Sequence, residues 1–240
     1  MKNMHQAIYE LLKDKKRGFI LDAACGKGEL GGALEKAGHQ VFYMDKYDNP
    51  HSVQRFVNAD LNDFLPYKNE QFDFAVCAES LQYLENHEKL FREFRRVLKT
   101  GGSLIISFPN VLTVSSRLYF LRRGYFQHFK PFRTKQNKEW DHFIYNIPSF
   151  VEIFELIKKN GFELGDVIAL DIKLKNLLLY PFLKALYLPG LLFDKNKNMG
   201  KTEMTKRLAS RELLTGNRLV INCYHNIVNR FLMLRNIITS

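Results

Sequence analysis

The chain has 240 residues, of which 46% are hydrophobic and 25% are charged, so one globular domain with a sizeable core is expected. Its net charge is +11, and the whole excess lies in residues 111–240, because residues 1–110 hold 15 basic and 15 acidic side chains. The three cysteines, Cys25, Cys77 and Cys223, have no paired spacing, which argues against a disulfide framework or a cysteine-based zinc site and suits a reducing cytoplasm.

The first 110 residues alternate strand and helix patterns. The N-terminal stretch is too polar for a signal peptide, and no run is long and apolar enough to span a bilayer. Strands separated by helices indicate a parallel sheet covered on both faces. We expect helices over 5–14, 28–39 and 86–102, the last closed by Gly101 and Gly102, and strands over 18–24, 40–45, 55–61, 72–79 and 103–110.

The pattern changes after residue 110. A mixed aromatic and basic segment comes first, and a later apolar stretch is expected to be broken by Pro181 and Pro189. We expect a further helix over 148–160 and strands over 162–170 and 217–225. The expected organisation is one domain, 1–240, with a core of 18–110, 148–171 and 216–226 and two insertions, 111–147 and 172–215, that cap the substrate side.

The stretch "ILDAACGKGELGG", residues 20–32, runs from a strand pattern through a glycine turn into a helix pattern. Such a turn presents free backbone N–H groups and lets a ligand approach the backbone closely. Gly26 to Gly31 fit the spacing G-x-G-x-x-G, and Asp45 ends the next strand pattern, where it would reach ribose hydroxyls. These features alone suit NAD as well as other adenosine ligands.

Three further features disfavour NAD. Asp22, four positions before Gly26, would repel a pyrophosphate but could accept a hydrogen bond from an ammonium group. Asp60, in "NADLND", stands where a carboxylate can take the exocyclic amine of adenine. Residues 72–110 then run through strand, turn, helix, Gly-Gly and strand patterns without a gap.

Together these segments resemble the class I S-adenosylmethionine-dependent methyltransferases, in the broad group that modifies small molecules, lipids and saccharides. The resemblance covers 18–110 strongly and 141–171 more loosely, in "LDAACGKGEL", "YMD", "NADL", "FDFAVCAESLQYL", "LKTGGSLIISFPN" and "DHFIYNIPSFVEIFELIKKNGFEL". It implies an α/β, Rossmann-like, doubly wound fold with a seven-stranded sheet. Six strands would be parallel, and residues 217–225 would form one antiparallel strand at the edge.

The resemblance also implies S-adenosylmethionine as cofactor and S-adenosylhomocysteine as product. The glycines would admit the methionine part, Asp22 would help to hold its ammonium, and Asp45 would hold the ribose with Lys46 beside it. Asp60 and Leu61 would flank the adenine, and the end of the fourth strand would line the far wall. The implied cofactor-binding residues are Asp22, Ala23, Cys25, Gly26, Lys27, Gly28, Asp45, Lys46, Asp60, Leu61, Cys77, Ala78 and Glu79. Cys25 and Cys77 are interpreted as small packing residues rather than nucleophiles.

The implied reaction is displacement at the sulfonium methyl, for which the enzyme mainly supplies alignment and proximity. An oxygen acceptor that is a poor acid also needs a base, and His142 in "DHFIY" is the candidate, with a purely structural histidine as the alternative. His87 is expected at the surface, and no acidic cluster after the fourth strand indicates a metal. The candidate substrate residues are Glu79, Tyr83, Asn110, Arg117 and Tyr145.

The insertions should select the substrate. Arg117, Arg122 and Arg123 among aromatic residues can clamp a phosphate or carboxylate. Residues 176–193 suit a helical cap first, and a membrane surface or a lipid tail second. We therefore expect O-methylation of a small-molecule, saccharide or lipid-linked acceptor by a cytoplasmic protein, with contact at a membrane surface left open.

Other functions stay open at this point. The basic C-terminal half suits ribose methylation of RNA, although the signature of base amino-methylation is absent from "CAES". A cofactor-binding protein without catalysis is a second alternative, and a dehydrogenase is a remote third. The acceptor, the methylated atom, the pathway and the oligomeric state do not follow from the sequence.

Overall fold

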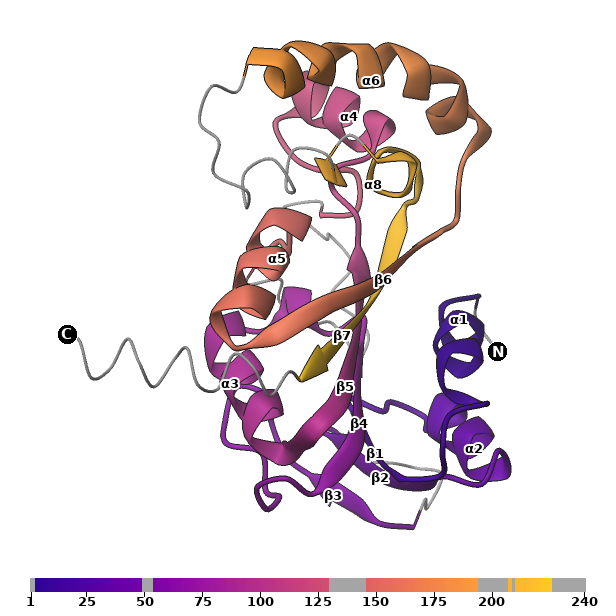
Figure 1. The fold of residues 1–240 in the computed structure, drawn as a ribbon, viewed down its shortest axis with the longest axis vertical. Helices are drawn as coiled ribbons and strands as arrows, with labels where there is room; N and C mark the ends of the chain where they lie inside the picture. Colours follow the sequence, from indigo (N-terminus) through magenta and orange to yellow (C-terminus); the bar gives the residue numbers. More distant parts are fainter. Residues whose placement is uncertain (1–2, 49–53, 130–145, 194–206, 209, 226–240) are drawn as a thin grey trace, which may run out of the picture.

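The computed structural model describes residues 3–48, 54–129, 146–193, 207–208 and 210–225, and in it a seven-stranded sheet lies between two layers of helices (Figure 1). The sheet order is β3-β2-β1-β4-β5-β7-β6. The strands are β1 Phe19–Ala23, β2 Gln40–Asp45, β3 Phe56–Asn58, β4 Phe72–Ala78, β5 Leu98–Pro109, β6 Phe162–Leu170 and β7 Arg218–His225. The helices are α1 Asn3–Leu12, α2 Glu29–Lys36, η1 Leu81–Tyr83, α3 His87–Val97, α4 Val114–Arg123, α5 Phe150–Lys159, α6 Leu174–Phe193 and α8 Arg211–Thr215.

The fold class is the expected Rossmann-like α/β sheet, with β7 as its antiparallel strand. Its place in the sheet differs from the expectation, however. β7 pairs antiparallel with β5 on one side and with β6 on the other, so β6 forms the edge. The segment after α5 therefore supplies the outermost strand, and β7 enters between two strands that precede it in sequence.

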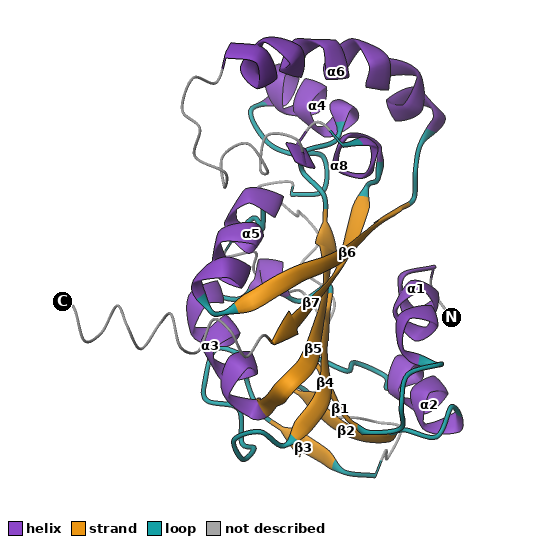
Figure 2. Cartoon of the chain, viewed as in Figure 1, coloured by secondary structure: helices purple, strands orange, loops and turns teal. Residues whose placement is uncertain are grey.

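Alternating strand residues divide the core between the two faces of the sheet. Along β1, for example, Ile20 packs with α1 and α2, whereas Leu21 packs on the side of α3 and α5. Figure 2 shows these two helix pairs on opposite sides of the strands. This double burial explains why the strand segments read as nearly continuous apolar runs.

Two expected boundaries are wrong. α3 ends at Val97 rather than at the Gly-Gly pair, because Leu98 adopts an extended conformation and pairs with Phe72, so Gly101 and Gly102 lie within β5. The expected breaks at Pro181 and Pro189 are both absent, and α6 continues through the two prolines.

α4, α6 and α8 form a helical lobe beyond the carboxyl ends of β5 and β6 (Figure 1). The buried side chain of Asn176 joins all three helices. Its Oδ1 accepts from the backbone N–H of Ser115 at 3.2 Å, and its Nδ2 donates to the carbonyl of Thr215 at 3.0 Å. Among the described residues, no helix combines the length and hydropathy needed to cross a membrane.

Candidate functional site

The turn between β1 and α2 has an unusual backbone. Ala24, Gly26 and Gly28 all have positive φ angles, of 63°, 52° and 72°, and the N–H of Gly28 donates to the carbonyl of Cys25 at 2.9 Å. A Cβ added at Gly26 would meet no atom within 4 Å, so the turn is open on that side. Lys27 is exposed on the same turn. A ligand can therefore reach the backbone here without a side chain in the way.

Gly31 has a different role: its lack of a side chain allows close packing and does not open a path for a ligand. A Cβ at this position would lie 2.2 Å from Cε1 of the buried Tyr43 ring. The third glycine of the motif thus allows α2 to lie directly on β2, which fixes the direction in which the helix leaves the turn.

Asp22 is buried near the carboxyl end of β1, beside this turn. Burial raises the pKa of its carboxyl, the backbone N–H of Gly31 lowers it, and the nearby charge of Asp45 raises it, so that together they bring the pKa to about 7. Within the described part of the chain, Oδ2 of Asp22 has no hydrogen-bond partner. Burying a carboxyl oxygen without a hydrogen-bond donor costs free energy. The site therefore fits a ligand that supplies a hydrogen-bond donor, above all a cationic one.

Asp45 connects the end of β2 to the glycine turn. Its Oδ2 accepts from the N–H of Gly26 at 2.8 Å, and its Oδ1 accepts from the N–H of Tyr47 at 3.0 Å. The structure thus brings together an acid and a glycine that are 19 positions apart in sequence.

Asp60 and Leu61 follow β3, and Leu61 is buried. Lys46, expected beside Asp45, reaches across to Asp60 instead, with Nζ 2.9 Å from Oδ2. Although burial raises the pKa of Asp60, hydrogen bonds from Asn62 and the charge of Lys46 hold it below its usual value. Asp60 is therefore a charged acceptor that already has a counter-ion.

The end of β4 forms the opposite wall. Cys77 is fully buried, and burial raises the pKa of its thiol to about 12, so the thiol is protonated and suits packing. Ala78 is half-buried, and Glu79 has a φ of 55° and donates its N–H to Ser107. The carboxylate of Glu79 lies 3.4 Å from Nε of Arg218.

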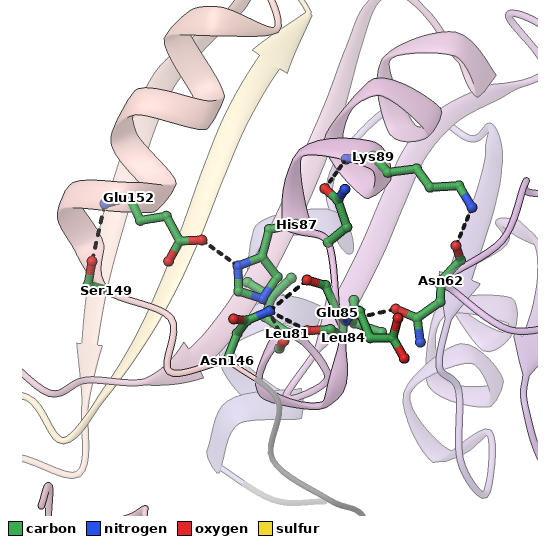
Figure 3. Close-up of polar contacts among 10 residues, drawn as sticks. Asn62, Leu81, Leu84, Glu85, His87, Lys89, Asn146, Ser149 and Glu152 are labelled. Carbon is green, nitrogen blue, oxygen red and sulfur yellow. Dashed lines mark hydrogen bonds and ion pairs between the residues drawn. The ribbon is translucent and has the colours of Figure 1, made fainter.

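His87 holds the loop after β4 in place, and the expectation that it lies at the surface is wrong. Its ring is buried at the start of α3, where Nε2 is 2.7 Å from the carbonyl of Leu81 and Nδ1 is 2.6 Å from Oε1 of Glu152 (Figure 3). A carbonyl and a carboxylate both accept, so both contacts need a doubly protonated ring. Accordingly, burial lowers the pKa of His87, but the bonds to Glu152 and Leu81 outweigh it and raise the pKa above its ordinary value.

Two asparagines, which the sequence analysis missed, complete this wall. Nδ2 of Asn146 donates to the carbonyls of Leu84 and Glu85 at 2.7 and 2.9 Å, and Oδ1 of Asn62 accepts from the N–H of Glu85 at 2.9 Å (Figure 3). Lys89 donates to the carbonyl of Asn62. The sequence does hold a hint of the role of Asn62, because this residue stands two positions after Asp60 in "NADLND". Nothing in the sequence indicates that Asn146 belongs to the same wall.

The five candidate substrate residues do not all lie where they could contact a substrate. Asn110 is buried, and its side chain bonds to the carbonyls of Leu213 and Gly216 and to the N–H of Leu112, so it fastens β5 to the lobe and we do not retain it as a substrate contact. Arg117 donates from Nε to the carbonyl of Leu112 at 2.8 Å, and Tyr83 ends η1. His142 and Tyr145 lie outside the described residues.

Comparisons with known proteins find a match to methyltransferases. Residues 21–106 match a family model described as a methyltransferase domain. A probable S-adenosylmethionine-dependent methyltransferase of Mycolicibacterium smegmatis is 25% identical over 172 residues, covering 68% of this chain and 60% of that protein. A ubiquinone biosynthesis O-methyltransferase of Xanthomonas oryzae is 26% identical over 132 residues, covering 50% and 55%. The chain thus spans less than two thirds of these two relatives.

Solved structures show the same fold. The crystal structure of Burkholderia thailandensis 1,6-didemethyltoxoflavin-N1-methyltransferase, with 1,6-didemethyltoxoflavin and S-adenosylhomocysteine bound, superposes with a TM-score of 0.55. The match covers 94% of this chain and 77% of that one at 13% sequence identity, so it bears on the fold alone.

Proposed function

Given that this chain carries a class I S-adenosylmethionine-dependent methyltransferase domain, we propose that it transfers the methyl group to an oxygen atom of a small-molecule, saccharide or lipid-linked acceptor. One observation carries the cofactor part of the proposal. Oδ2 of buried Asp22, which has no hydrogen-bond partner among the described residues, lies at the same end of the sheet as the open turn at Gly26 and the carboxylate of Asp45. A ligand with an ammonium group and ribose hydroxyls satisfies all three.

The residues of the site would divide the cofactor between them. Asp22 would accept from its ammonium, directly or through water, and Asp45 would accept from the ribose hydroxyls while keeping its bond to Gly26. Leu61 would supply an apolar contact for the adenine ring beside Asp60. When bound, S-adenosylmethionine supplies a methyl group on a sulfonium, which is already activated for displacement.

The chain's own contribution to the reaction is therefore mainly alignment. The wall between Glu79 and Glu85 is fixed by His87 on one side and by Asn62 and Asn146 on the other, which would hold the acceptor side of the site rigid. We propose that Glu79, Tyr83, Arg117 and Tyr145 contact the acceptor and that His142 takes its proton.

The acceptor class rests on two supports. The relative from Xanthomonas oryzae is named as an O-methyltransferase, and it matches half of this chain. Arg117, Arg122 and Arg123 on α4 suit an acceptor that carries a phosphate or carboxylate. A cytoplasmic location belongs to the same proposal, because Cys25, Cys77 and Cys223, all among the described residues, form no disulfide, which suits a reducing compartment.

Calorimetric titration with S-adenosylhomocysteine, with NAD as a parallel control, tests the cofactor. Binding of the first and not of the second is expected. Asp45→Ala should weaken binding by about tenfold or more, since it removes charge-assisted hydrogen bonds, and Asp45→Asn should retain part of the affinity. Binding of NAD alone would overturn the proposal. His142→Ala should slow turnover without changing the affinity for S-adenosylhomocysteine, and unchanged turnover would make His142 structural.

A further inference from the structure

The exposed apolar side chains of this protein are concentrated on the helical lobe. Twelve large hydrophobic side chains are exposed in the described part of the chain, and eight of them lie on α4, on α6 or just before α6. They are Leu118, Phe120 and Leu121 on α4, Ile172 before α6, and Leu174, Leu178, Leu179 and Phe182 on α6. Isolated exposed hydrophobic residues are ordinary, but this concentration is not.

On α6 the exposed residues form a stripe. Leu174, Leu178 and Phe182 follow one another at intervals of four, and their side chains are 70%, 71% and 67% exposed. Residues four apart lie on the same face of a helix, so the three side chains form one continuous apolar ridge.

The direction of this stripe is set by Asn176. Because Asn176 is fully buried and bonds to Ser115 and Thr215, its face of α6 points into the lobe. Leu178 follows it by two positions, which is about 200° around the helix, so the stripe points away from the lobe. Figure 1 shows α6 as the outermost helix, with α4 between it and the sheet.

The charges beside the stripe are mainly basic, and the acid Asp171, just before Ile172, lies 3.2 Å from Nη1 of Arg218. Lys173 and Lys175 are exposed at the start of α6, and Lys184 is exposed further along, with its ammonium 5.7 Å from the Tyr180 ring. Residues 172–193 contain no Asp or Glu, and neither does α4, which carries three arginines. A second copy of this face would bring like charges together, whereas an anionic surface would complement them.

We propose that the outer face of α6 docks on an anionic lipid surface, with Leu174, Leu178 and Phe182 inserted among the lipids and the lysines beside the headgroups. Leucine and phenylalanine side chains on the outer face would bury apolar area among the lipids, and the lysines beside them would be attracted to anionic headgroups. The proposal is independent of the methyl-transfer activity, because the face is described by α6 alone.

Cosedimentation of the full chain with lipid vesicles tests the proposal. The protein should bind vesicles of equal parts phosphatidylglycerol and phosphatidylcholine, and it should bind far more weakly to phosphatidylcholine alone. The double variant Leu178→Ser with Phe182→Ser should lose binding. Lys173→Gln with Lys175→Gln should weaken it by roughly thirty-fold, since each basic residue near such a surface contributes a similar increment.

Phe64→Ser is the matched control, because Phe64 is 74% exposed but lies outside the lobe, and this variant should bind vesicles as the unchanged chain does. Circular dichroism and the affinity for S-adenosylhomocysteine should be the same in all variants, which separates a docking defect from misfolding. Failure of the unchanged chain to bind anionic vesicles overturns the proposal, as does binding that survives the loss of Leu178 and Phe182. A dimer in sedimentation velocity that becomes a monomer in the serine variant, without vesicle binding, would assign the face to a second copy instead.

Discussion

The sheet and the helical lobe of this protein are stabilised in different ways. Strands from residues 1–110, whose charges balance, are buried between helices on both faces of the sheet, and Asp22 near the end of β1 and Asp45 at the end of β2 lie beside the glycine turn. The lobe keeps many of its large hydrophobic side chains on the outside and carries an excess of basic residues, while Asn110 and Asn176 fasten it from within. Cofactor geometry therefore depends on close packing, whereas the lobe depends on a few polar contacts and leaves its surface free to meet a partner.

Among the predictions for the sheet, a substitution of Gly31 should change the stability of the protein most. Gly31→Ala places a methyl carbon 2.2 Å from Cε1 of the Tyr43 ring, so we expect a loss of about 3 kcal/mol in the free energy of unfolding. Gly32→Ala in the same helix meets nothing within 4 Å and should stabilise the protein by about 0.5 to 1 kcal/mol. Chemical denaturation measures both, and equal effects at the two positions would contradict the packing argument.

Asn176 provides the corresponding effect in the lobe. Asn176→Ala leaves the N–H of Ser115 and the carbonyl of Thr215 without their partner, which should cost about 2 kcal/mol. Hydrogen exchange should show the loss in α4, α6 and α8 while β1 and β2 keep their protection. Leu174→Ala, at a position that is 70% exposed, should change stability by less than about 0.5 kcal/mol. Loss of protection spread evenly through the sheet would mean that the two regions are not separately stabilised.

The carboxyl of Asp22 should make both the stability of the protein and its affinity for S-adenosylhomocysteine depend on pH. Its pKa of about 7 lies above the ordinary value, so the folded protein holds a proton that the unfolded chain has lost between these two values. The stability of the free protein should therefore fall as the pH rises towards 7. Over the same range the affinity for S-adenosylhomocysteine should rise, by at most about tenfold per pH unit, because the ionised carboxylate accepts from the ammonium.

Thermal denaturation and calorimetric titration across this pH range measure the two trends. Asp22→Asn should flatten both and weaken binding at higher pH. A variant that keeps the full pH dependence would assign the titration to another group.

A substitution of Glu152 should give the smallest change in stability, through its contact with His87. The raised pKa of His87 means that its two contacts are complete below the ordinary histidine pKa and are lost as the pH rises through the raised value. Glu152→Gln keeps an acceptor for Nδ1 but removes the charge, so the loss should move to lower pH, with a change below about 1 kcal/mol because Glu152 is partly exposed. The imidazole resonances in NMR report this shift directly. Glu155→Gln, exposed on the same helix, should leave them where they are, and an equal shift there would point to a general charge effect.

Local pattern was sufficient to predict the fold class and the main elements. β2 and β6 have the bounds that their apolar runs predict, and Gly26 and Asp45 stand at the ends of strands that any parallel arrangement brings to the same edge. The apolar pattern of a strand and the glycines of a turn are local features, so they can be recognised in the sequence.

Other features depended on contacts between distant segments. His87 contacts Glu152, 65 positions later, and β7 lies between β5 and β6 because it pairs antiparallel with both. The end of α3 at Val97 results from pairing of Leu98 with Phe72. The sequence by itself therefore determined which residues form the sheet and the turn. Only the tertiary structure decided which polar groups are left buried without a partner and which apolar face is left outside, because both depend on what packs against each element.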